Sequence, residues 1–129
     1  MTKEDKKTLL VDLSARLPYK VKVCLYEKET CVLLGIDGYE VYLDVDSDSF
    51  RIESIKPYLR PMSSMTEEEY EELKSISPYY GFAPFEFIGD WCPNYEMTDW
   101  LNAHHFDYRG LIEKGLAIAV TEENNPYKE

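Results

Sequence analysis

Hydrophobic residues near the start of the chain recur at the spacing of one face of an α-helix. The residues on this face are Leu9, Leu10, Leu13 and Leu17. Thr2 precedes them as a candidate N-cap, and acidic side chains follow it in the first turn, where the helix dipole favours them. Pro18 disfavours helical geometry in the residue before it. The pattern therefore predicts a helix that begins after Thr2 and ends before Pro18.

The pattern then changes to the alternation of hydrophobic and polar residues that is typical of half-buried strands. The predicted strands lie within residues 19–27, 31–36, 39–45 and 50–55. The Asp37–Gly38 pair between the second and the third is a strong hairpin signal. Four short antiparallel strands with tight connections predict a small, strongly bent sheet or an SH3-like barrel.

A segment with two prolines separates this β region from a second helical region. Pro57 and Pro61 favour extended chain there, so it is the natural boundary between two lobes. Beyond it, the capping-box pair Thr66 and Glu69 begins a helical pattern. We therefore predict an α+β protein with an N-terminal helix and a four-stranded β lobe in residues 1–62, and an acidic helical lobe in residues 63–129. One compact domain is the alternative.

The stretch MTDWLNAHHFDYRGLIEKG predicts two more short helices. Thr98 is a candidate cap for residues 100–105, and Asp107 is a candidate cap for residues 108–114. Gly115 suits the left-handed residue just past a helix end. The following LAIAV is either a closing strand or an apolar extended segment, and the polar tail TEENNPYKE is expected to fray.

This stretch also holds the residues that most resemble a chemical site. They are His104, His105 and Asp107, with Cys92 upstream. A metal site or a Cys–His nucleophile pair is one interpretation, but adjacent helical residues point about 100° apart and the HExxH spacing is absent. The other interpretation is structural: Asp107 caps a helix, His104 packs under Trp100, and His105 stays near water. No motif indicates a cofactor.

Charge is distributed unevenly along the chain and bears on the choice of partner. The net charge is −11, of which residues 1–62 contribute −1 and residues 63–129 contribute −10. Binding to a phosphate backbone needs clustered positive charge, so the acidic half is a poor candidate for nucleic acid. An acidic surface serves solubility or a basic protein partner.

Neither a membrane segment nor a secretory signal is predicted. No apolar run approaches the roughly 18 residues of a transmembrane helix, and the charged start contains acidic residues. A cytoplasmic location is therefore expected. The three cysteines, Cys24, Cys31 and Cys92, lack metal-type spacing and are expected to be free thiols.

An aromatic loop, residues 78–97, contains seven Tyr, Phe or Trp residues in a stretch rich in proline. Its rings either cover the core where the lobes meet or form a binding surface. A non-catalytic protein-interaction function is our leading hypothesis. Its expected contact surface consists of Tyr26, Tyr42 and Tyr58 on the β lobe and Tyr79, Tyr80, Phe82, Phe85 and Trp91 in the aromatic loop.

Two other functions remain open at this point. A nucleic-acid accessory protein would use a basic face on the β lobe made by Lys20, Lys22, Arg51, Lys56 and Arg60. A small metal-dependent enzyme would be centred on the cluster of Cys92, His104, His105 and Asp107.

At IKPYLRPMSSMTEEE and DWLNAHHFDYRGLIEKGLA the sequence resembles a set of small proteins encoded in gut Bacteroides-type genomes, often in prophage or mobile regions. The likeness covers residues 52–69 and 99–117 best and the β region more loosely. The set has no established activity from which residue roles could be carried over. The resemblance implies a bacterial cytoplasmic setting and a phage origin. The leading hypothesis is accordingly an interaction protein that serves as an accessory protein of a phage or mobile element.

Overall fold

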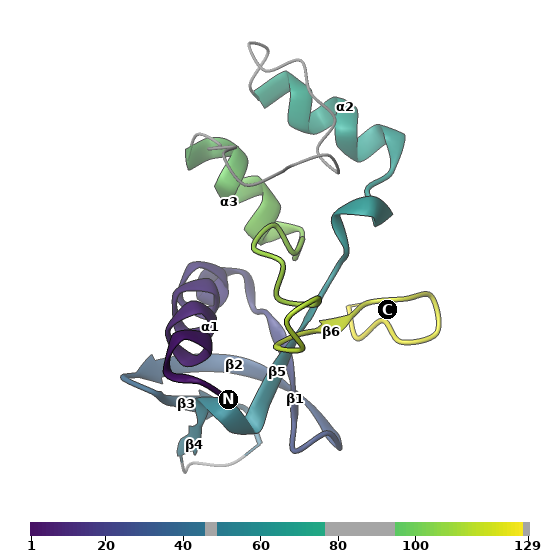
Figure 1. Ribbon diagram of the computed structural model, residues 1–129. Coiled ribbons are helices and arrows are strands. Elements are labelled where there is room, and N and C mark those ends of the chain that lie inside the picture. Colours follow the sequence, from purple (N-terminus) through teal and green to yellow (C-terminus); the bar gives the residue numbers. More distant parts are fainter. Residues whose placement is uncertain (46–48, 77–94, 128–129) are drawn as a thin grey trace.

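The computed structural model describes residues 1–45, 49–76 and 95–127 and has an α+β fold (Figure 1). The helices are α1 (Lys3–Arg16), α2 (Glu67–Ile76) and α3 (Tyr95–Ala103). The strands are β1 (Lys22–Leu25), β2 (Glu29–Asp37), β3 (Glu40–Leu43), β4 (Ser49–Arg51), β5 (Ile55–Leu59) and β6 (Ile118–Ala119). Short 3₁₀ helices occupy Leu17–Tyr19, Ile52–Ser54 and Met62–Ser64.

Helix α1 forms where the hydrophobic pattern predicts it. Thr2 and Asp5 make a reciprocal capping box, so two backbone N–H groups of the first turn are satisfied. The helix ends at Arg16, and Pro18 lies in the 3₁₀ helix that follows. Leu9 and Leu13 are fully buried against the sheet. The prediction of this element is confirmed.

The sheet is open and has six strands among the described residues, in the order β4-β3-β2-β1-β5-β6. Neighbouring strands are antiparallel except β5 and β6, which are parallel. The predicted four-stranded SH3-like barrel is therefore not confirmed. The segment 50–55, predicted as one strand, is divided by the 3₁₀ helix Ile52–Ser54, so that β4 ends before it and β5 begins after it.

Strand β5 crosses the segment that was expected to be a boundary between lobes. Pro57 pairs with Val23 of β1, whereas β6 pairs only with Tyr58 and Leu59. Within the described chain Pro57 thus has a paired strand on one side only, which is the position where a sheet accepts a proline. The extended chain expected from the prolines is present, and hydrogen bonding to β1 makes it a strand.

Two groups of buried side chains hold the fold together. The larger group lies between α1 and one face of the sheet, and it includes Leu111, Leu116 and Ala117 from the C-terminal region. The smaller group joins α2 and α3, and Trp100, Leu101 and Phe106 are among its members. Figure 1 shows α1 against one side of β2 and β3. Helices α2 and α3 lie beyond the C-terminal end of β5.

The helical region differs from its prediction in two places. The capping box of Thr66 and Glu69 is confirmed, with hydrogen bonds of 3.0 and 3.1 Å. Helix α3 begins at Tyr95, so Thr98 lies inside the helix and its predicted capping role is wrong. The second predicted helix, over residues 108–114, is also wrong, because residues 111–115 form turns in which Asp107 accepts the backbone N–H groups.

Candidate functional site

The outer sheet face is defined here as the side of β2 and β3 that is turned away from α1. In β3, Val41 and Leu43 are buried and Tyr42 is exposed, as the alternation of a strand requires. In β2, Leu33 is buried and Leu34 is 60% exposed, and a register shift lies between Leu33 and Gly35. Large apolar side chains on two neighbouring strands therefore lie in solvent on the same face.

Gly35 supports this arrangement. It pairs directly with Tyr42, and a Cβ atom built at Gly35 would lie 3.6 Å from Cδ2 of the Tyr42 ring. The tyrosine ring therefore lies beside bare backbone, with no neighbouring side chain across from it. Tyr42 therefore presents an aromatic surface that is 38% exposed.

The other tyrosines of the predicted contact surface lie in different environments. Tyr26 is 58% exposed in the β1–β2 turn, and its ring meets that of Phe50 in an edge-to-face contact at 6.2 Å. Tyr58 is buried, and its hydroxyl lies 3.4 Å from Oγ1 of Thr30. Burial also raises the pKa of Tyr58. Tyr58 is therefore not part of an exposed surface. The predicted contact residues Tyr79, Tyr80, Phe82, Phe85 and Trp91 lie outside the described residues.

Two members of the predicted basic face have partners within the protein. Arg60 forms two hydrogen bonds of 2.7 Å with Glu69, and its guanidinium lies over the Phe106 ring. The ammonium group of Lys22 donates to the carbonyl oxygen of Pro126 at 2.6 Å. The remaining members are Lys20, Arg51 and Lys56. Of the five predicted cations, Arg60 and Lys22 are therefore engaged within the protein, and the other three remain as candidates for a basic face.

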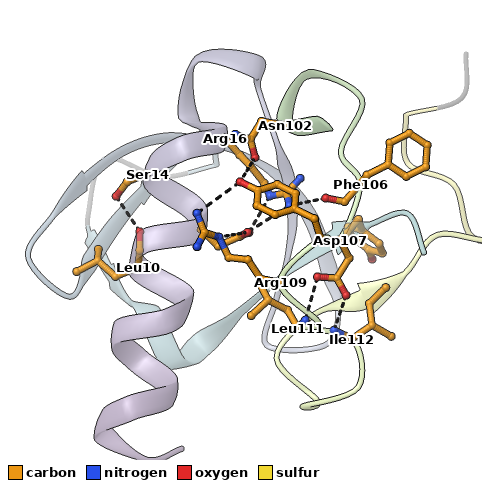
Figure 2. Close-up of polar contacts among 12 residues, drawn as sticks. Leu10, Ser14, Arg16, Asn102, Phe106, Asp107, Arg109, Leu111 and Ile112 are labelled. Atoms are coloured by element: carbon orange, nitrogen blue, oxygen red, sulfur yellow. Dashed lines mark hydrogen bonds and ion pairs between the residues drawn. The ribbon is translucent and has the colours of Figure 1, made fainter. Parts of the chain in front are cut away.

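The predicted polar cluster is used for local structure. Nδ1 of His104 lies 2.9 Å from the carbonyl oxygen of Trp100, and its ring stacks on the indole at 4.0 Å. Both carboxylate oxygens of Asp107 accept backbone N–H groups, from Leu111 and Ile112 (Figure 2). In the described part of the chain no three His, Cys, Asp or Glu side chains are grouped to hold a metal ion. Cys92 lies outside that part.

His105 is half-buried, whereas the sequence led us to expect it near water. Its backbone adopts φ 62°, and its ring stacks on Tyr127 with the ring centres 3.9 Å apart. Nδ1 is buried without a hydrogen-bond partner. Burial, and next the positive charge of Arg16, lower the pKa of His105 to about 4. The imidazole is therefore neutral at pH 7.

We expect His105 to make stability depend on pH between about 6.5 and 4. The unfolded chain binds this proton near pH 6.5 and the folded chain near pH 4, so the stabilisation is present above pH 6.5 and lost as pH falls to 4. Because the ring is partly solvated, the loss from pH 7 to 5 is expected to be about 1 kcal/mol. Urea unfolding of His105→Asn at both pH values should lack this component, since asparagine tolerates positive φ. An identical pH dependence in wild type and variant would contradict the assignment.

The C-terminal segment contains a contact that the sequence analysis missed. The hydroxyl group of Tyr127 accepts the N–H of Lys22 at 2.9 Å and donates to the carbonyl oxygen of Tyr58 at 2.8 Å. It thereby joins β1 and β5 beyond their last paired residues, Val23 and Pro57. The expectation that the tail frays is therefore wrong for Tyr127. In the sequence, the only indication of this contact is that Tyr127 is the one aromatic residue in the polar stretch TEENNPYKE.

A buried polar network was also missed. Asp12 and Arg16 are fully buried on α1, and Nε of Arg16 donates to Asp12 at 2.7 Å. The other end of Arg16 donates to the carbonyl oxygen of Phe106, a contact drawn in Figure 2. Nε of Arg109 lies 3.2 Å from the Asp12 carboxylate. This network ties α1 to the segment that carries the histidine pair.

Comparisons with known proteins assign no relatives to this fold. No family model, curated protein or solved structure matches the chain. In the ranges that the structure describes, no helix is both long and apolar enough to cross a membrane.

Proposed function

We propose that this chain is a non-catalytic protein-interaction protein, and that the outer sheet face is its contact surface. The observation that carries the proposal is the exposure of Leu34 and Tyr42 on one face of two adjacent strands. Large apolar and aromatic side chains exposed together are typical anchors of protein interfaces. The resemblance at residues 52–69 and 99–117 supports an accessory role in a bacterial phage or mobile element.

The charge around this face indicates the chemistry of the partner. Glu40 and Asp44 are exposed next to Tyr42 on the same strand and in the turn that follows it. The chain as a whole carries a net charge of −11. A partner that offers an apolar anchor bordered by Lys and Arg side chains would complement this surface in both shape and charge. We therefore propose a basic protein as the partner.

The first test is affinity capture with a tagged chain from a Bacteroides-type host lysate. We expect the wild type to enrich one basic protein at defined stoichiometry, with and without nuclease. The double variant Leu34→Thr and Tyr42→Thr should lose this protein, since threonine keeps strand propensity and removes the apolar anchors. Loss of both anchors should weaken binding by at least about tenfold.

Val11→Thr is the matched control. Val11 is 46% exposed on α1, away from the outer sheet face, and valine and threonine have similar helix propensities. Capture that is equal for wild type and double variant would refute the outer sheet face as the contact surface. Enrichment that disappears with nuclease would instead support the nucleic-acid alternative through Lys20, Arg51 and Lys56.

A further inference from the structure

A depression of about 370 Å³ opens on the sheet beside the β1–β2 turn, apart from Leu34 and Tyr42. Its lining comes from the end of β1, the 3₁₀ helix Ile52–Ser54, β5 and β6. Cys24, Tyr26 and Ile118 line it as the less polar residues. This volume falls in the range of pockets that hold a single small molecule.

The charged groups of the depression are of opposite sign. Glu53 is paired with Lys6 at 3.0 Å, and this hydrogen bond lowers the pKa of Glu53. The side chains of Lys56 and Glu27 have neither a hydrogen bond nor an ion pair with any described residue, although the Lys56 backbone pairs with β1. The rim therefore presents one ammonium group and one carboxylate that are both available to a ligand.

The turn that carries Glu27 is strained. Tyr26 and Glu27 have φ values of 52° and 62°, in the left-handed region that favours glycine and asparagine. The turn is closed by a 3.0 Å hydrogen bond from Lys28 N–H to the Leu25 carbonyl, and Tyr26 N–H donates to the Ser54 carbonyl at 3.0 Å. An Asn-Gly pair would make the same turn without this strain. Non-glycine residues held in such conformations cluster at ligand-binding sites.

We propose that this depression binds a free α-amino acid with an apolar side chain. The Lys56 ammonium would receive the ligand carboxylate, and the Glu27 carboxylate would receive the ligand ammonium. Cys24, Tyr26 and Ile118 would contact the apolar side chain. The lining of the depression includes neither Leu34 nor Tyr42. Failure of the leucine experiments would therefore not refute the proposed interaction function, and the reverse also holds.

L-leucine is the probe, with N-acetyl-L-leucine and L-leucinamide as analogues that each lack one charge. We expect the wild type to bind leucine at least about tenfold more tightly than either analogue by calorimetry. In NMR titrations the amide signals of Glu27, Lys56 and Ile118 should shift. Absence of leucine binding at millimolar concentration, or equal affinity for all three compounds, would overturn the proposal.

Two charge-neutralising variants separate the roles of the two groups. Lys56→Gln should bind leucine and leucinamide equally, because the carboxylate partner is gone. Glu27→Gln should bind leucine and N-acetyl-leucine equally, because the ammonium partner is gone. Lys3→Gln, at an exposed position on α1, should keep the wild-type preference. A variant that retains full discrimination between the compounds would refute the role of the group it removes.

The strain in the turn offers a readout that a purely structural turn would not give. Glu27→Gly should raise the melting temperature, since glycine accepts positive φ, and should also lose the preference for leucine over N-acetyl-leucine. Retention of that preference in a stabilised Glu27→Gly chain would overturn the role of the carboxylate. Tyr39→Phe, in an exposed loop position, should change neither property.

Discussion

Replacement of Asp12 by asparagine is expected to lower the free energy of unfolding by about 3–5 kcal/mol. Asp12 and Arg16 are each 0% exposed, so the variant leaves the Arg16 guanidinium buried without its counter-charge. Arg109 is one-third exposed and can turn to solvent, whereas Arg16 cannot. For a chain of this length the loss corresponds to a fall of about 15 °C in melting temperature.

The measurement is urea unfolding of Asp12→Asn beside two comparison variants. Glu53→Gln removes the same kind of carboxylate from the exposed pair with Lys6 and should leave stability nearly unchanged. The double variant Asp12→Leu and Arg16→Met should recover most of the loss, because it removes both buried charges together. An Asp12→Asn chain as stable as Glu53→Gln would show that Arg16 finds other compensation.

Elements whose determinants are close in sequence could be predicted. The N-cap at Thr2, the capping box at Thr66, the break after Arg16 and the left-handed Gly115 each depend on residues within one turn. Helix α3 begins at Tyr95, within the range 78–97 that was predicted as the aromatic loop. The sequence analysis found no helix cap there, so the predicted start was too late. Local signals located α1, α2 and α3, but they also predicted a helix over residues 108–114 that does not form.

Contacts between distant residues could not be predicted from the pattern. Tyr127 bonds to Lys22 across 105 residues, and Arg16 bonds to Phe106 across 90 residues. The sequence marks Asp12 as an interruption in an apolar helix face, but nothing nearby identifies its partner. Pairing between β5 and β1 likewise overrides the usual meaning of Pro57 as a strand breaker.

Only part of the candidate site could be predicted, because the rest depends on contacts between residues that are distant in the sequence. Strand alternation correctly placed Tyr42 on the solvent side and Val41 in the core. It could not distinguish exposed Tyr42 from buried Tyr58, because Tyr58 contacts residues that are distant in the sequence, such as Thr30. The exposure of Leu34 follows from alternation with the buried Cys31 and Leu33, but the CVLLGI segment is apolar at almost every position, so the pattern did not show which of its faces is buried.

Replacement of Tyr127 by phenylalanine is expected to cost about 1–3 kcal/mol of unfolding free energy. The phenyl ring can keep its stack on His105, but the backbone N–H of Lys22 and the carbonyl of Tyr58 lose their shared hydroxyl partner. Burial raises the pKa of Tyr127, which agrees with a hydroxyl held away from solvent.

The loss of the Tyr127 hydroxyl should weaken protection locally, at β1 and β5, as well as lower the overall stability. A local loss would indicate that the hydroxyl links the two strands, beyond the packing of the ring. Hydrogen exchange at the Lys22 amide should accelerate far more in Tyr127→Phe than exchange at Val41, in a strand that Tyr127 does not contact. Tyr42→Phe, which removes a hydroxyl from an exposed ring, should leave both rates and the stability unchanged. If the protection of the Lys22 amide is unaltered in Tyr127→Phe, other contacts hold β1 and β5 together beyond the Val23–Pro57 pair. A selective loss at Lys22 would show that one hydroxyl at the C-terminal end of the described chain completes the sheet.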